Sequence, residues 1–434
     1  MPVAAADASA SAAPASAEST VISGRWFYGW TLVVALGVTE TVSYGILQYA
    51  FPVFIAPMGA ELGWSMAAVT GALSLATLVS AAAAVPAGRW VDRHGPRGLM
   101  TAGSILAALL LLAWSRVRTL EGFYLLSAGL GLAMAAVLYE PAFAVVASWF
   151  HRLRGRALTV LTFIAGFASV IFVPLATGLV DAHGWRQALV WLAAILAVTT
   201  IPPHALLLRR RPEDLGLHPD GAPSASFDSL DGAGEPSVSA RAAVRTRSFA
   251  WLAAAFSLSA LAGTAVAVHL IPLLLERGHT PAFAGAVLGM VGLMALPGRL
   301  VFTPLGGRWP RAAVTAAIFA LQGLGIAALM LGEGTAGVWA FVVLFGAGFG
   351  AITPARAALV AELYGRASFG AVNGTLALLL ALARAAAPIG ASLLYLAGGG
   401  YPLVLAVLAA LSFASAAAVL GSGRPHPHPI ASTA

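Results

Sequence analysis

The sequence predicts an all-α membrane protein with twelve transmembrane helices arranged as two six-helix halves. Three observations support this fold. Hydrophobic residues make up 59% of the 434 positions and charged residues only 9%, whereas a soluble domain carries about 25% charge. Apolar stretches of about 20 residues, the length that crosses a bilayer, recur along the chain. Short loops separate these stretches, and alternate loops are rich in arginine.

Six spans are expected before the middle of the chain and six after it. They lie near 28–54, 66–87, 98–115, 122–147, 156–180, 186–208, 249–275, 282–305, 311–331, 336–361, 368–395 and 402–421. The long polar interval 209–248 is interpreted as a cytosolic linker between the halves 28–208 and 249–421. Residues 1–27 are expected to be a disordered cytosolic tail without the features of a signal peptide, and 422–434 a second cytosolic tail.

The arginines orient the chain. Seventeen of the 24 lie in loops and tails on one side, four on the other side, and three inside spans. Because cytosolic loops carry the excess of basic residues, both termini are predicted to be cytosolic, in a multi-pass protein of the cell inner (cytoplasmic) membrane. The same asymmetry explains the net charge of +7 without a nucleic-acid partner.

Several chemistries are excluded by residue usage. Cysteine is absent, so disulfides and Cys-ligated metals are excluded. Lysine is absent too, which excludes an ATP-binding P-loop. We therefore expect a protein that is not an enzyme, with no catalytic residues, cofactor or metal. It is expected to be a monomer whose partners are the lipid bilayer, a small solute, and a proton or counter-anion.

The two halves repeat weakly in sequence. Four short matches lie 215 to 219 positions apart: Gly88–Trp90 with Gly307–Trp309, Gly129 with Gly346, Gly131 with Gly348, and Gly155 with Gly370. Parallel repeats imply a pseudo-two-fold axis along the membrane normal, with the solute path between the halves.

The strongest local motif follows the second span, in Gly88-Arg-Trp-Val-Asp92-Arg93-His-Gly95-Pro-Arg97. Asp92 can pair with an arginine or cap the N-terminus of a neighbouring helix, and Gly95 with Pro96 predicts a tight turn. The motif resembles the G-x-x-x-D-R-x-G-x-R pattern of the major facilitator superfamily. The resemblance implies that the motif belongs to a cytosolic gate. The gate residues are expected to be Gly88, Asp92, Arg93, Gly95 and Arg97.

A finer resemblance runs along the first half. It rests on Tyr28-Gly-Trp30, Glu61-Leu-Gly-Trp-Ser65, Trp149-Phe150 with Gly155-Arg-Ala-Leu158, and Gly184-Trp-Arg186. These segments are similar to the bacterial branch of monocarboxylate-transporter-like and oxalate/formate-antiporter-like proteins. The resemblance implies a carboxylate substrate.

Two arginines inside spans are candidates for binding that substrate, because a charge there is costly and needs a purpose. Arg299 lies in the eighth span and Arg384 near the middle of the eleventh. Two guanidiniums facing one cavity can hold a carboxylate through paired hydrogen bonds, and the resemblance implies such contacts from these two spans. Arg299 lies near the end of its helix, so snorkelling to the interface is the alternative. Ala295 stands where animal monocarboxylate transporters carry an aspartate implicated in proton coupling, which puts that route in doubt.

Two intramembrane acids, Glu40 and Glu140, are candidates for proton coupling or for structural pairing with an arginine. For Glu140, beside Pro141, a structural or gating pair is favoured. Tyr44 and Gln48 follow Glu40 at helical spacing and are expected to line the cavity on the same face. Arg356 and Glu362 are expected to belong to an inner gate or a salt bridge.

Together these features predict a secondary active transporter that moves a small organic anion, a mono- or dicarboxylate, by alternating access, with proton symport or anion exchange. The alternative is a proton-coupled efflux antiporter for hydrophobic or cationic compounds, which Glu40 keeps open. A non-transporting sensor on the same scaffold is a third class, and no appended signalling domain supports it.

Overall fold

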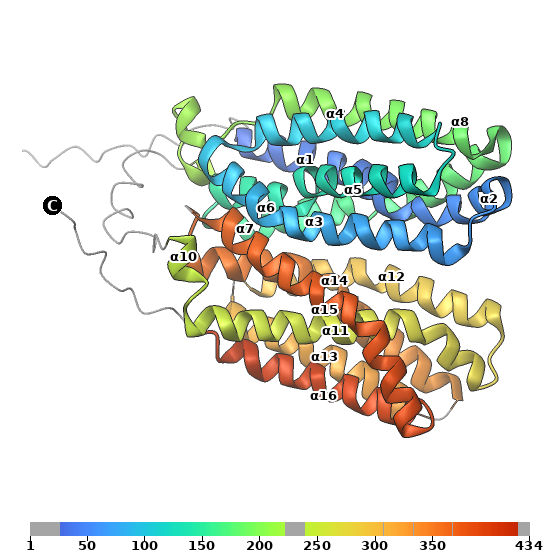
Figure 1. The fold of residues 1–434 in the computed structure, drawn as a ribbon. Helices are drawn as coiled ribbons and strands as arrows, with labels where there is room; N and C mark the ends of the chain where they lie inside the picture. Colours follow the sequence, from blue (N-terminus) through green and yellow to red (C-terminus); the bar gives the residue numbers. More distant parts are fainter. Residues whose placement is uncertain (1–26, 222–238, 307, 333, 367, 424–434) are drawn as a thin grey trace, which may run out of the picture.

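The computed structural model describes residues 27–221 and 239–423 except 307, 333 and 367, and within these the chain is helical with no strand (Figure 1). The first half contains α1 (Tyr28–Tyr44), a π-helical turn (Gly45–Tyr49), α2 (Phe51–Leu62), α3 (Met66–His94), α4 (Pro96–Trp114), α5 (Leu120–Val137), α6 (Tyr139–Trp149), α7 (Arg154–Ala165) and α8 (Ala168–Leu206). The second half follows a short α10 (Ala240–Ala243) and contains α11 (Arg247–Glu276), α12 (Pro281–Leu305), α13 (Arg311–Leu331), α14 (Gly334–Tyr364), α15 (Phe369–Gly398) and α16 (Tyr401–Leu420). The predicted all-α fold is confirmed.

Eleven segments of the described chain are long and apolar enough to cross a membrane. One of them, Arg154–Leu206, has 53 residues, and a straight helix of that length would measure about 80 Å against a hydrocarbon core of about 30 Å. It is not straight, because Gly184 has φ 74° and ψ 161°. The predicted spans near 156–180 and 186–208 lie on either side of this glycine.

Two spans are broken near the middle of the molecule. The first span changes from α-helix to a π-helical turn at Gly45–Tyr49 before α2 continues. In the fourth span, α5 ends at Val137 and α6 begins at Tyr139, with Leu138 extended between them. Pro141 explains this break, because its ring has no N–H and clashes with the carbonyl four residues earlier, at Val137.

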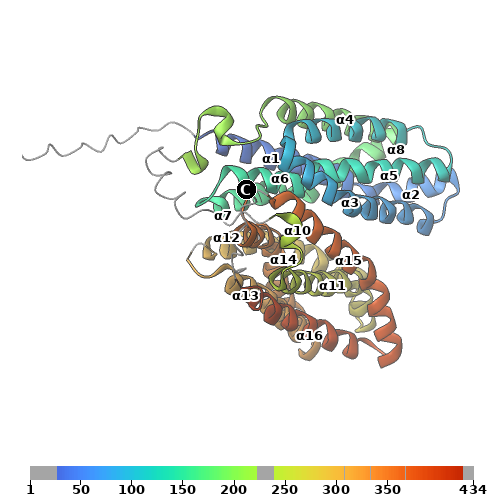
Figure 2. The same ribbon diagram turned by 60° about the vertical axis from the view of Figure 1, so that its left-hand side comes forward.

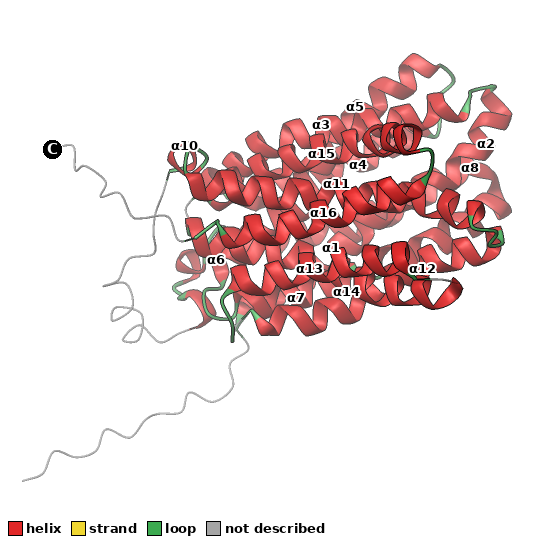
Figure 3. Ribbon diagram, turned by 90° about the horizontal axis from the view of Figure 1, so that it is seen from below, coloured by secondary structure: helices red, strands yellow, loops and turns green. Residues whose placement is uncertain are grey.

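The halves touch at one end and separate towards the other. In Figure 2 the ribbons lie together near α7, α12 and α15 and diverge towards α2 and α16. The packing agrees: one buried apolar cluster contains residues of both halves, such as Phe143 of α6 and Phe369 of α15. Two other clusters belong to the first half alone and the second half alone. The joined end carries the loops with Arg93, Arg97 and Arg152, and we call it the arginine-rich end. Short loops join the helices there and at the opposite end (Figure 3).

Small residues allow the closest contact between the halves, where α3 crosses α15. A side chain at Gly88 would collide with the carbonyl of Gly370, and one at Gly374 with the carbonyl of Ala84. Both helices thus present two small residues four positions apart, a pattern that lets helix backbones approach closely. The arginine-rich end is closed by this contact.

The predicted linker and tails are described only in part. Residues 1–26, 222–238 and 424–434 lie outside the described residues. The start of the linker folds back on the first half: the Asp220 carboxylate accepts hydrogen bonds from the backbone N–H groups of His151 (3.2 Å), Arg152 (2.6 Å) and Leu153 (3.2 Å). The segment just before α7 is therefore held by an acid that lies 67 to 69 positions later in the chain.

Candidate functional site

A group of polar side chains lies between the halves, about midway along the spans. We call it the central polar cluster, and its members are Glu40, Tyr44, Tyr139, Glu140, Arg356 and Arg384. The first four come from α1 and α6, and the two arginines come from α14 and α15. Each lies within electrostatic range of other members. The helix breaks at Gly45–Tyr49 and Leu138 flank this cluster, as is common where helices build a binding site.

An ion pair across the halves joins Glu140 of α6 to Arg356 of α14, with 3.1 Å between Oε1 and NH2. The two residues are 216 positions apart, within one residue of the offset of 217 that pairs Gly129 with Gly346 in the same spans, so they occupy nearly equivalent places in the two halves. Equivalent residues near a two-fold axis face one another. In this chain the equivalent positions carry opposite charges, so the internal symmetry brings attraction rather than repulsion.

Glu40 is the most deeply buried acid of the cluster. Its side chain is fully buried, and neither carboxyl oxygen has a hydrogen-bond partner among the described residues. Glu140, which is also acidic, lies within electrostatic range of it. A charged carboxylate without hydrogen bonds in such surroundings is costly.

Aromatic rings line the cluster on the side of the first half. The Tyr44 ring centre lies 4.7 Å from that of Tyr139 and 6.2 Å from that of Tyr49, and Tyr139 stacks on Phe143 at 4.9 Å. Gln48 lies inside the π-helical turn, which rotates it away from the regular helical spacing that the sequence prediction assumed. Its amide oxygen is buried without a hydrogen-bond partner in the described part of the chain.

Arg384 faces the first half from the middle of α15. Its electrostatic neighbours are Arg356, Tyr44, Glu140 and Tyr49, and the residue keeps solvent-accessible surface although protein atoms surround and desolvate its guanidinium. No acid in the described residues forms an ion pair with it. An arginine in mid-span without an acidic partner among the described residues is costly to hold there.

Arg299 has a different environment. Its Nε donates to the carbonyl of Gly350 on α14 at 3.2 Å, and NH1 donates to the carbonyl of Thr162 on α7. Gly166 leaves room for this guanidinium, since a side chain there would contact NH1. Arg299 therefore ties both α12 and α14 to the first half in this state.

The gate motif lies at the contact between α3 and α15. The Asp92 carboxylate accepts hydrogen bonds from the backbone N–H groups of Gly370 and Ala371, both at 2.9 Å. These N–H groups belong to the first turn of α15. Of the two roles expected for Asp92, pairing with an arginine or capping a neighbouring helix, the structure therefore shows the cap, which the helix dipole also favours. Gly95 makes the turn before α4 with φ 82°. The Arg93 and Arg97 side chains are exposed.

Glu362 pairs inside its own half. Its Oε2 lies 2.9 Å from Nε of Arg311 on α13, whose NH1 also donates to the carbonyl of Ala358 at 3.0 Å. Glu362 thus contacts Arg311, while Arg356 pairs with Glu140.

Sequence reasoning missed two contributions to the closed end. The first is the pair Gly370 and Gly374, whose four-residue spacing was a readable signal for close helix packing. The second is Glu213 in the linker, 3.0 Å from Arg366 of the second half. The sequence does not indicate which arginine Glu213 contacts, because it is one of several acids in the polar linker. Within the described residues, no three His, Asp or Glu side chains gather closely enough to hold a metal ion.

Comparisons with known proteins agree with this architecture. A family model described as Major Facilitator Superfamily matches residues 36–388. The chain is 27% identical over 345 residues to monocarboxylate transporter 13 of Bos taurus, across 79% of this chain and 76% of that protein. It is 29% identical over 191 residues to the oxalate:formate antiporter of Oxalobacter formigenes, across 43% of this chain and 44% of that protein. The solved structure of the transporter FucP in the outward conformation superposes with a TM-score of 0.71 at 16% identity, over 91% of this chain and 99% of that one.

Proposed function

Because the chain belongs to the Major Facilitator Superfamily, a family of membrane transporters rather than enzymes, we propose that it carries a small organic anion, a mono- or dicarboxylate, across the cytoplasmic membrane by alternating access. The observation that carries this proposal is the position of Arg384 in mid-span, solvent-accessible and within electrostatic range of Tyr44 and Glu140 of the other half. A positive charge at that depth is expensive and is useful where an anion must be attracted into a cavity between low-dielectric walls. The similarity to a monocarboxylate transporter and to an oxalate:formate antiporter supports the same substrate class.

The proposed topology has twelve spans and both termini in the cytosol. Its support is the kink at Gly184, which makes two spans of the 53-residue segment, together with the excess of arginines at the closed end. The closed end is then cytosolic, and the conformation described here is outward-facing.

In the proposed cycle, the anion enters from outside and binds Arg384 beside the Tyr44 and Tyr139 rings. Arg299 is the second basic contact. It reaches the substrate when the halves rearrange, because its present bonds to Thr162 and Gly350 belong to the closed cytosolic end. Breaking the Asp92 and Glu140 contacts between the halves then opens the site to the cytosol.

Glu40 is the proposed proton carrier. A neutral Glu40 fits the outward-facing state, where its carboxyl oxygens have no hydrogen-bond partner among the described residues. Opening of the cytosolic end would admit water and favour release of the proton. Glu140, paired with Arg356, is proposed to serve as a gate rather than as the carrier.

Uptake of labelled carboxylates into proteoliposomes tests the proposal. A panel of monocarboxylates and dicarboxylates is supplied outside, with and without a pH gradient. We expect saturable uptake of at least one acid, its loss in Arg384→Ala, and partial retention in Arg384→Lys. Arg116→Ala, which removes an exposed arginine at the opposite end, is the matched control. Unchanged uptake in Arg384→Ala would remove this arginine from the site.

The coupling arm separates symport from exchange. If a pH gradient drives uptake in the wild type but not in Glu40→Gln, Glu40 carries the proton. If uptake instead requires an anion on the inside and ignores the pH gradient, the protein is an exchanger. Transport of amphiphilic cations with no carboxylate uptake would favour the efflux antiporter and contradict the anion proposal.

A further inference from the structure

The repeat relation between the halves exposes a missing charge at the closed end. In the first repeat, Asp92 caps the start of α15. The offset of 219 positions that pairs Gly88 with Gly307 also pairs Asp92 with Arg311, and the repeat pairs Gly155 on α7 with Gly370 on α15 at an offset of 215. The second repeat therefore has an arginine where the first has the carboxylate that ties the halves together.

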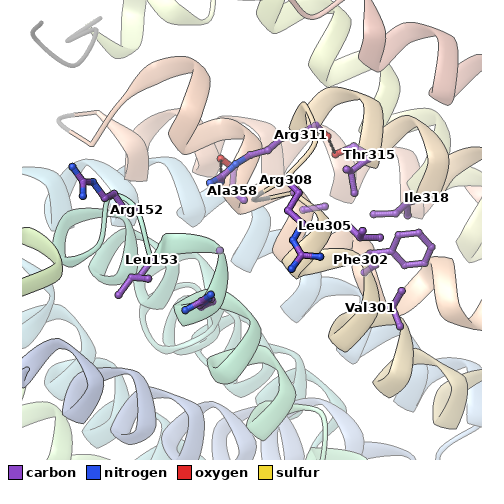
Figure 4. Close-up of a pocket in the computed structure, with 16 residues that line it drawn as sticks. Arg152, Leu153, Val301, Phe302, Leu305, Arg308, Arg311, Thr315, Ile318 and Ala358 are labelled. Carbon is purple, nitrogen blue, oxygen red and sulfur yellow. Dashed lines mark hydrogen bonds between the residues drawn. The ribbon is translucent and has the colours of Figure 1, made fainter. Parts of the chain in front are cut away.

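A cavity occupies the place of the missing contact. It has a volume of about 540 Å³ and lies between the start of α7, the end of α12 and the start of α13, with Gly155 and Arg311 both in its lining. Three further arginines line it, namely Arg152 and Arg156 from the first half and Arg308 from the second. Figure 4 shows Arg308 and Arg311 in this cavity, with Arg311 bonded to the carbonyl of Ala358.

The charges around this cavity are unbalanced. Arg311 is paired with Glu362, and Asp220 is occupied by backbone N–H groups before α7. The side chains of Arg152, Arg156 and Arg308 form no ion pair with any acid in the part of the chain that the structure describes. Arginines of both halves thus line one cavity without acidic partners, and an anion bound there would turn their mutual repulsion into attraction.

The remaining walls indicate what kind of anion fits. Val301, Phe302 and Leu305 form an apolar side of the cavity, and Val301 is 55% exposed. Trp309, next to Arg308, is 65% exposed, as expected of a tryptophan at the depth of lipid headgroups. A small soluble anion would contact only the arginines. A phospholipid would contact both sides of the cavity, because its headgroup phosphate would bind the arginines and its acyl chains would pack against the apolar side. Basic pockets between transmembrane helices on the cytosolic side bind anionic headgroups.

We propose that this cavity binds the headgroup phosphate of an anionic phospholipid, which takes the place that Asp92 has in the first repeat and bridges α7 to α12 and α13. The bound lipid strengthens the closed cytosolic end. The inference does not depend on the identity of the transported solute.

The test measures lipid retention by the full-length protein. The wild-type protein is reconstituted in nanodiscs of phosphatidylcholine with a minor fraction of phosphatidylglycerol. It is then released from the nanodiscs in a native mass spectrometer, and the lipid molecules that remain bound to it are identified and counted. We expect selective retention of phosphatidylglycerol. Arg156→Gln with Arg308→Gln should weaken retention more than tenfold, since each arginine near the membrane surface contributes roughly fivefold in affinity. Arg156→Lys with Arg308→Lys should keep it.

The matched control is Arg89→Gln with Arg245→Gln, which removes two exposed arginines outside the lining of this cavity. Arg89 is the repeat counterpart of Arg308. Retention should stay at the wild-type level in this control. Equal losses in both double variants would mean diffuse surface charge and would overturn the proposal. Displacement of the lipid by inorganic phosphate would also overturn it, because the cavity would then be a site for soluble anions.

Discussion

At the closed end, two repeat-related junctions hold the halves together, α3 with α15 and α12 with α7, and they do so through different contacts. Between α3 and α15 the backbones touch through Gly88, Gly370 and Gly374, and Asp92 caps the helix across the interface. Between α12 and α7 the corresponding residue is Arg311, which pairs inside its own half, and a cavity remains. The α3–α15 junction is held by direct contacts between protein atoms, whereas the α12–α7 junction contains a cavity lined by arginines that could bind a ligand.

This difference shows that equivalent positions of the internal repeat in this protein carry unlike charges. Residues at equivalent positions still meet, as Glu140 and Arg356 do. Their charges have diverged, to opposite signs at the centre and from acid to base at the second junction. The two junctions should therefore respond differently to substitution.

Gly88→Val should have the largest effect, because it attacks the tighter junction. The added side chain meets the backbone of Gly370 and Ala371, which cannot move aside as a flexible side chain can. Overpacking costs about 1–3 kcal/mol or more, so the closed state should fall roughly 10- to 100-fold in population and carboxylate uptake should be lost. The measurements are the uptake rate in proteoliposomes and the rate at which a thiol introduced on α15 reacts with a maleimide.

Labelling reports closure directly, because the chain has no cysteine and one introduced thiol is unique. Val372→Cys places it at a fully buried position on α15, where a membrane-impermeant maleimide added from the cytosolic side reacts only when that end opens. Gly88→Val should speed this reaction. Gly98→Ala is the control, since a side chain there has open space. A variant Gly88→Val with wild-type uptake would show that the α3–α15 contact is not needed for closure.

Asp92→Asn should have the next largest effect and should separate the two junctions. It removes the charge that two N–H groups at the start of α15 bind, and hydrogen bonds to a charged group contribute about 1.5–3 kcal/mol. Because an amide oxygen keeps part of the bond, we expect roughly a tenfold faster labelling of Val372→Cys.

Arg311→Gln is the comparison at the other junction. It breaks the pair with Glu362, which lies within the second half, so in a bilayer of neutral lipid it should lower the unfolding temperature without speeding the labelling. Asp181→Asn, an exposed acid at the opposite end, should change neither quantity. If Arg311→Gln opened the closed end as much as Asp92→Asn does, the two junctions would be equivalent after all.

Much of the fold could be predicted from the sequence, because hydropathy and arginine placement are properties of single segments. The helix cap by Asp92 was one of two alternatives that the motif itself allowed. The pair between Glu140 and Arg356 was within reach, since their 216-residue separation matches the repeat offset.

The rest depends on how helices are rotated against one another. Nothing in the sequence around Arg299 indicates that its guanidinium would meet two backbone carbonyls, because backbone partners carry no side-chain signal. The π-helical turn that holds Gln48 was hidden for a related reason: it changes the helical period that such predictions assume. The contacts of Asp220 and Glu213 could not be predicted either, because they depend on the path of the linker, and the polar composition of the linker does not determine that path.

Glu213→Gln should have the smallest effect of these substitutions, and it tests whether the linker adds to the contrast between the junctions. Its carboxylate lies 3.0 Å from Arg366, but the two side chains are 41% and 33% exposed, and exposed ion pairs contribute about 0–1 kcal/mol. We therefore expect at most about a fivefold faster labelling of Val372→Cys at low ionic strength, vanishing at high salt where such pairs are screened. Asp92→Asn should retain most of its effect in the same salt, because its carboxylate is only partly accessible and binds backbone groups. If salt abolished both effects equally, the Asp92 cap would be a surface interaction, and the first junction would owe its closure to glycine packing alone.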